Sequence, residues 1–234
     1  MKSTLGIFVL LGIMLSAAPA DAATKVFLLG GQSNMAGVGQ YPGGVVNGKT
    51  IPPEPAIPAP YDDPQPDVQF WHNNAWTDLR PGFGFQSGEF GPEVTFGYRL
   101  NQLFPDDDIY LVKYAESGSN LAVQWKPDGT GAQYNAFKSR VNSALLNLNN
   151  AHLNPEVAGM IWMQGESDAN KHEYAVHYAE NLAALIDKVR LDFDAADMRF
   201  VIGRIDDWPW GATADCDLVR AAQQTVAEAD DNAA

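Results

Sequence analysis

The stretch KVFLLGGQSNMAG, residues 25–37, decides the fold of this chain. It opens with a short, mainly apolar run, residues 25–29, which is typical of a strand buried on both faces. Gly30 and Gly31 follow and let the backbone bend sharply. The stretch therefore predicts a buried strand that ends in a tight turn, with Ser33 on that turn.

Three later runs resemble this first strand, and helical patterns separate them. The strand-like runs span residues 109–112, 157–163 and 199–203. Apolar residues recur at helical spacing over residues 92–103, 137–148 and 174–193, and again from Asp217 to Val226. Strands that alternate with helices predict a mostly parallel, three-layer α/β domain.

One segment breaks this alternation. From Tyr41 to about Asn74 the chain is rich in proline and glycine, and prolines remove backbone donors. We expect this segment to lack regular hydrogen bonding and to run over the sheet edge as a long excursion of one domain, because the alternation resumes after it.

The first 22 residues have the features of a secretory signal peptide. Lys2 precedes an apolar run over residues 5–18, and Ala20-Asp21-Ala22 provides small residues for cleavage before Ala23. The run is too short for a membrane span of roughly 30 Å. We therefore expect a secreted or periplasmic protein whose single domain spans residues 23–234. Cys216 is the only cysteine, so no intrachain disulfide can form.

Composition narrows the possible partners. Among 234 residues, 29 are acidic and 15 basic, which gives a formal charge of −14, and 46% are hydrophobic. Such a chain can bury a substantial core. Nucleic-acid binding is disfavoured because it depends on clustered Lys and Arg, and an anionic membrane surface would repel the chain.

The turn that carries Ser33 suits a nucleophile. In a parallel α/β sheet, ligands bind outside the carboxyl ends of the strands, and a helical turn there aims free N–H groups at an incoming oxygen. The turn lacks the glycine spacing of dinucleotide sites and the lysine of phosphate loops. It also lacks the second glycine of the α/β-hydrolase elbow. A purely structural turn remains the alternative for Ser33 taken alone.

Two further loops are expected at the same edge of the sheet. Residues 113–121 follow the second strand, and residues 163–168 follow the third. An oxyanion site needs donors from separate loops that converge on one point. Gly118 can provide a backbone N–H, Gln164 a side-chain amide and Ser33 its own N–H.

Four motifs together carry a family resemblance: GQSNM at residues 31–35, FGPE at 90–93, GSNL at 118–121 with Trp125 after it, and WMQGESD at 162–168. The chain resembles the sialate O-acetylesterase and acetylxylan esterase family, a carbohydrate-esterase branch of the SGNH hydrolases. The resemblance implies a flavodoxin-like sheet, no metal and no cofactor, and a Ser-His-acid mechanism that removes acetyl groups from glycans such as sialic acid or xylan.

The resemblance also implies roles for individual residues. Ser33 would be the nucleophile, and Gly118 and Gln164 would help to hold the oxyanion. Glu166 would either orient the catalytic histidine or brace the loops as a carboxylate that accepts loop N–H bonds.

The general base is the main departure from the family. Relatives carry it on a late Asp-x-x-His loop, and this sequence contains no such motif. A serine is a weak nucleophile without a base. We expect His72, His152, His172 and His177 to be exposed or otherwise satisfied. The chain is therefore expected to be a C-terminally incomplete esterase that lacks the final strand and the base loop, and to be less stable than a longer form, inactive, or both.

Other functions and ligands stay open at this stage. A non-catalytic glycan-binding protein could keep the scaffold without the base, and a lipase or thioesterase could share the fold. Loop tryptophans could line a glycan-binding mouth or fill the core; they are Trp71, Trp76, Trp125, Trp208 and Trp210. The acidic runs at 106–108 and 206–207 lack the spacing of a calcium site. The sequence does not identify the sugar, the hydroxyl or the oligomeric state.

Overall fold

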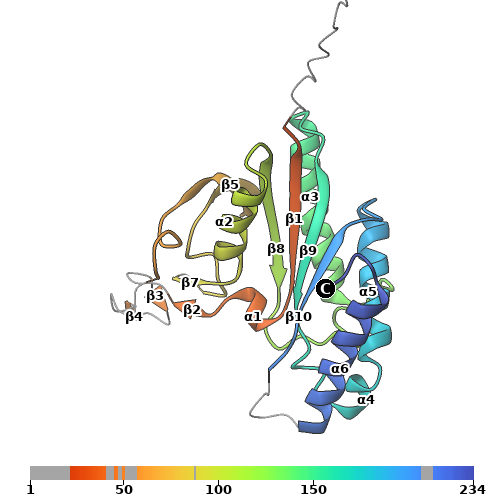
Figure 1. The fold of residues 1–234 in the computed structure, drawn as a ribbon. Coiled ribbons are helices and arrows are strands. Elements are labelled where there is room, and N and C mark those ends of the chain that lie inside the picture. Colours follow the sequence, from red (N-terminus) through yellow and green to blue (C-terminus); the bar gives the residue numbers. More distant parts are fainter. Residues whose placement is uncertain (1–21, 41–44, 47–48, 51–56, 87, 207–212) are drawn as a thin grey trace, which may run out of the picture.

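The computed structural model describes residues 22–40, 45–46, 49–50, 57–86, 88–206 and 213–234 (Figure 1). Most of the expected signal peptide lies outside the described residues, as do Trp208 and Trp210. No helix in the described ranges is both long enough and apolar enough to cross a membrane.

A six-stranded sheet forms the centre of the molecule, in the order β10-β9-β1-β8-β5-β6. Its strands are β1 (Thr24–Gly31), β5 (Gln65–His72), β6 (Ala75–Leu79), β8 (Asp108–Ala115), β9 (Glu156–Met163) and β10 (Arg199–Gly203). All neighbours pair in parallel except β5 and β6, which form an antiparallel hairpin. The prediction of a mostly parallel sheet is confirmed.

Two short two-stranded ladders lie outside the main sheet. One joins β2 (Gly39–Gln40) to β7 (Glu89–Phe90), and the other joins β3 (Val45–Val46) to β4 (Lys49–Thr50).

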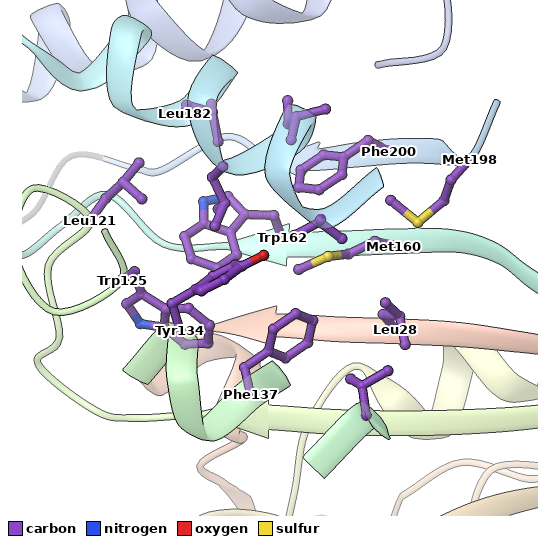
Figure 2. Close-up of a cluster of buried hydrophobic side chains, with 14 of the residues drawn as sticks. Leu28, Leu121, Trp125, Tyr134, Phe137, Met160, Trp162, Leu182, Met198 and Phe200 are labelled. Carbon is purple, nitrogen blue, oxygen red and sulfur yellow. The ribbon is translucent and has the colours of Figure 1, made fainter. Parts of the chain in front are cut away.

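Helices cover both faces of the sheet, as the alternating pattern predicts (Figure 1). One face packs against α2 (Glu93–Leu103) around Phe27 and Leu29. The other face packs against three long helices, α3 (Ala132–Asn150), α5 (Tyr178–Asp192) and α6 (Thr213–Ala229). Figure 2 shows aromatic and aliphatic side chains of this larger core; those labelled include Leu28, Trp125, Tyr134, Phe137, Trp162 and Phe200.

The proline-rich segment is more ordered than its composition predicts. The expectation that it lacks regular pairing is wrong for residues 65–72, which form β5, and for β3 and β4, which pair with each other. Pro66 is tolerated because the β5–β6 register shifts between Gln65 and Gln69, and pairing with β8 begins only at Val68. The segment thus extends the sheet.

The helix predicted over residues 174–193 is divided in two. A short helix α4 (His172–Ala175) precedes α5, and the Tyr178 hydroxyl at the start of α5 donates 2.7 Å to the Gln164 carbonyl. This bond fixes the first turn of α5 against the loop after β9.

After α6 the chain returns to the outer edge of β10. Phe200 N donates 2.8 Å to Asn232 O, and Ala234 N donates 3.0 Å to Phe200 O. The last residues therefore continue the hydrogen-bonded ladder beyond β10.

Candidate active site

The sheet register brings three turns to one edge. Gly31, the last residue of β1, lies opposite Ala115 of β8 on one side and Met163 of β9 on the other. The loops that follow these three strands therefore begin side by side at the carboxyl edge, where α1 (Ser33–Ala36) also lies (Figure 1).

Ser33 is held on a tightly constrained turn. Gln32 N donates 2.9 Å to Met163 O, and Gly37 N closes the short helix by donating 2.9 Å to Ser33 O. Gly31 has φ +148°, and a Cβ there would lie 2.1 Å from Met163 O, so no larger residue fits. Ser33 is half-buried, and its Oγ forms no hydrogen bond to any described residue.

Hydrogen bonds tie the three loops together. Glu116 N donates 3.1 Å to Gly31 O, which joins the second loop to the end of β1. Asn34 Nδ2 donates 2.6 Å to Glu166 Oε1, which joins the nucleophile turn to the third loop. The convergence expected from the sequence is thus present at the level of the loops.

Gly118 lies exposed on the second loop. Its φ of +71° is in the left-handed region, it is exposed, and the space where a Cβ would lie is open. Its N–H has no acceptor among the described residues.

Gln164 is placed differently from the expectation that its side-chain amide faces an oxyanion. The side chain is fully buried, and its Nε2 donates 2.6 Å to Asp168 Oδ2 and 3.0 Å to Ser119 O. Its Oε1 accepts a 3.1 Å bond from the Tyr178 hydroxyl. Both amide protons are therefore used inside the protein, and an oxyanion role would require one of these bonds to break.

Asp168 is a site residue that the sequence reasoning missed. It is fully buried and accepts bonds from Leu121 N at 2.8 Å, Ala122 N at 3.0 Å and the Gln164 amide. Burial raises the pKa of its carboxyl, and these donors oppose the rise. The sequence assigned this bracing role, as one alternative, to Glu166; the only signal for Asp168 was its place at the end of the same motif.

Glu166 is a buried carboxyl beside the nucleophile turn. Its Oε1 accepts the Asn34 bond, and its Oε2 is buried without a partner among the described residues. Burial raises the pKa of Glu166, the Asn34 bond opposes the rise, and the charge of Asp168 adds to it. Of the two roles left open, loop bracing agrees with the Asn34 bond, and none of the four histidines is hydrogen-bonded to Glu166 in the described structure.

The four histidines are exposed or have other partners, as expected. His172 Nδ1 is 2.7 Å from Asp215 Oδ1, and His177 Nδ1 is 3.8 Å from Glu180. These two and His152 are exposed, whereas His72 is half-buried with its ring centroid 4.7 Å from that of Phe83. No imidazole is hydrogen-bonded to Ser33 in the described part of the chain.

The described tryptophans serve the core. Trp71 and Trp125 are buried, and Trp76 packs edge-on against Trp71. Trp125 Nε1 donates 2.8 Å to Ser119 Oγ, so Trp125 supports the loop of Gly118 from beneath. A glycan-binding role for these three indoles is not supported by their placement.

A buried ion pair that the sequence did not predict anchors the other end of α1. Lys113 Nζ donates 2.8 Å to Glu93 Oε2, 2.9 Å to Ala36 O and 2.8 Å to Phe83 O. Both charged side chains are buried. In the sequence, the one indication of this ion pair is a lysine, Lys113, directly after an apolar strand-like run. Across the described residues there is no cluster of three or more His, Cys, Asp or Glu side chains that could hold a metal ion.

Comparison with solved structures shows the same fold in several proteins. A protein from Arabidopsis thaliana is 23% identical with a TM-score of 0.70, and the alignment covers 90% of this chain and 84% of that one. NanS is 18% identical with a TM-score of 0.60, covering 88% and 76%. A carbohydrate acetylesterase from Xanthomonas citri is 19% identical with a TM-score of 0.54, covering 86% and 47%. No curated protein matched the chain.

A family profile matches nearly the whole expected mature chain. The profile is described as carbohydrate esterase, sialic acid-specific acetylesterase, and it matches residues 23–233. The resemblance inferred from the four motifs is confirmed. The chain therefore belongs to this family of carbohydrate esterases, and it is a carboxylic ester hydrolase that removes acetyl groups from carbohydrates.

Proposed function

We propose that Ser33 is the nucleophile of this deacetylation. Its Oγ attacks the carbonyl carbon of the acetyl ester, the bond from that carbon to the sugar oxygen breaks, and the sugar leaves as an alcohol. Water then attacks the acetyl-serine, which releases acetate and regenerates Ser33. The observation that carries this proposal is the placement of a half-buried serine, with no hydrogen bond to a described residue at its Oγ, on the first turn after β1.

The oxyanion of the tetrahedral intermediate would be held by backbone donors. The N–H of Gly118 and the N–H of Ser33 lie on neighbouring loops, and neither has an acceptor in the described ranges. Donors that are already oriented stabilise developing charge without reorganisation. Gln164 and Asp168 then act as positioning residues, because their bonds fix the loop of Gly118.

No histidine is hydrogen-bonded to Ser33 in the described structure, so the geometry assigns no imidazole as the general base. Glu166 is a buried carboxyl that is bonded to the turn through Asn34. We propose that it holds the loop rather than taking the serine proton itself, because its one bond to the turn goes to Asn34 and not to Ser33.

We further propose that the protein acts outside the cytoplasm, on O-acetylated sialic acids in preference to acetylated xylan. The location rests on the leader-like residues 1–22, with their positive start, apolar run and small residues before Ala23. The choice of sugar rests on the description of the matching family. We expect the tagged full chain in the periplasmic or secreted fraction. N-terminal sequencing of that fraction should show cleavage before Ala23.

The decisive experiment measures acetate release and labelling of the serine together. The wild-type chain should release acetate from O-acetylated N-acetylneuraminic acid, and an aryl phosphonate should attach to Ser33, as read by peptide mass spectrometry. Ser33→Ala should lose both signals while keeping the wild-type melting temperature, because Ser33 Oγ has no partner to lose. Ser117→Ala, on the neighbouring loop, is the matched control. Acetate release without labelling of Ser33, or by the Ser33→Ala variant, would overturn the assignment of Ser33 as the nucleophile.

A further inference from the structure

A cavity opens beside the nucleophile turn. It has a volume of about 310 Å³, and its lining includes Ala36, Ala115, Glu116, His72 and Arg140. A second cavity of about 630 Å³ shares His72, Phe83, Gly84 and Phe85 with it, so the two form one trough. This volume is sufficient for a sugar and its substituents.

The cavity lies within reach of an ester bound at Ser33. Ala36 is three residues after Ser33 in α1, and side chains at that spacing lie on the same helical face about 5–6 Å apart. Glu116 belongs to the loop of Gly118 and donates its N–H to Gly31 O. A group attached to the same sugar ring as the acetyl ester could therefore enter the cavity.

Arg140 contributes an uncompensated positive charge to this cavity. It projects from α3, and its Nη2 donates 2.7 Å to Trp71 O. Its Nε is buried without any partner, and the side chain forms no ion pair among the described residues. A guanidinium stays charged even when burial opposes the charge, as it does here. Several of its N–H donors are thus left for a ligand.

The neighbouring groups do not cancel that charge. Lys113 also lines the cavity, and its charge is balanced by Glu93. Burial lowers the pKa of His72, and the cations Arg140, Arg80 and Lys113 lower it further. The electrostatic potential at His72 is therefore positive. Among the described lining residues, the carboxylates are Glu116 and, in the second cavity, Asp62, and both are exposed, where solvent screens them.

We propose that this cavity binds the carboxylate of an acidic sugar, with Arg140 as its recognition group, while the acetyl ester of the same sugar lies at Ser33. The inference rests on the proposed function and assigns the residue and the cavity that recognise its substrate. A guanidinium matches a carboxylate with two parallel N–H···O bonds. Phe85, 53% exposed at the trough, offers an apolar face to the sugar ring.

Two substrates that differ only in charge test the proposal on the unaltered protein. They are O-acetylated N-acetylneuraminic acid and its methyl ester, in which the carboxylate is neutral. Acetate release should show a KM about 10- to 100-fold lower for the acid, the range expected for a charge-assisted bond. Calorimetry on the Ser33→Ala variant should show the same preference: the sugar acid without its O-acetyl group should have a lower dissociation constant than its methyl ester.

Arg140 variants locate the effect. Arg140→Met should raise the KM for the acid to that of the methyl ester, whereas Arg140→Lys should retain part of the preference. Arg99→Met is the matched control, since Arg99 is an exposed helical arginine that bonds only to Gln102 in the described structure. Thermal unfolding of each variant shows whether the loss of the Trp71 bond has affected the fold.

The outcomes separate the two proposals. Equal KM and equal binding of the acid and the methyl ester would overturn the carboxylate site while leaving deacetylation at Ser33 intact. Absence of acetate release from every acetylated sugar would overturn the proposed function, and the binding measurement would still decide the carboxylate site. A preference for the acid that survives Arg140→Met would also overturn the assignment to this cavity.

Discussion

Replacing Lys113 by methionine should destabilise the protein severely. Lys113 Nζ donates all three of its protons, to Glu93, Ala36 and Phe83, so K113M removes three bonds at once. The Glu93 carboxylate would remain, fully buried, with the backbone N–H of Gly91 as its remaining donor among the described residues. Leaving one member of a buried ion pair without the other is the costly element of this change.

The expected loss is about 3–5 kcal/mol of unfolding free energy, the range found when one partner of a buried pair is removed. In a domain of this size each kcal/mol corresponds to about 2–4 °C, so the melting temperature should fall by about 6–20 °C. Because Lys113 holds the carbonyl end of α1, the fraction that stays folded should also turn over acetylated substrate more slowly.

Urea unfolding followed by circular dichroism measures the loss. The control is Lys126→Met, because Lys126 pairs with Asp128 at the surface and such pairs contribute about 0–1 kcal/mol. The double variant Lys113→Met with Glu93→Gln should recover part of the stability, since the stranded charge is gone. If K113M unfolds within about 1 kcal/mol of wild type, as K126M is expected to do, the anchoring role of this pair is refuted.

Three further substitutions probe the turns at the sheet edge. Gly31→Ala places a Cβ 2.1 Å from Met163 O and should cost about 3 kcal/mol or more in urea unfolding; a melting temperature equal to wild type would contradict the close approach. Asp168→Asn puts an amide N–H where the carboxylate now accepts bonds from backbone N–H groups. It should raise the activation free energy calculated from kcat by more than it lowers the unfolding free energy, which steady-state kinetics and urea unfolding together would show. Glu166→Gln should gain stability over wild type as pH rises. The raised pKa of folded Glu166 means that its stability contribution is present below the ordinary carboxyl pKa and lost as pH rises through the folded value. A pH-independent difference in unfolding free energy would count against it.

Much of the sheet could be predicted from the sequence because its strands are short apolar runs with glycine turns. β1, β8, β9 and β10 all match predicted runs, and their alternation with helices fixed the parallel pairing. The β5 strand was missed because its prolines signal a loop, whereas the ladder accommodates them at a register shift.

The roles of buried polar side chains could not be predicted in the same way. Lys113 bonds to Ala36, 77 residues away, and Gln164 bonds to Ser119, 45 residues away. The packing of loops determines such hydrogen-bond partners, and no periodic sequence pattern marks them. The sequence could place Gln164 and Glu166 at the correct edge, yet it could not tell which atoms they contact.

The contact of Gly31 with the carbonyl of Met163 has a wider consequence for how such an enzyme can diversify. Since two adjacent strands touch there without space for a methyl group, the sheet itself fixes the backbone that leads into the serine turn. New substrate preferences can then arise from side-chain changes in the trough, at exposed positions such as Phe85, while the strands keep the start of that turn in place.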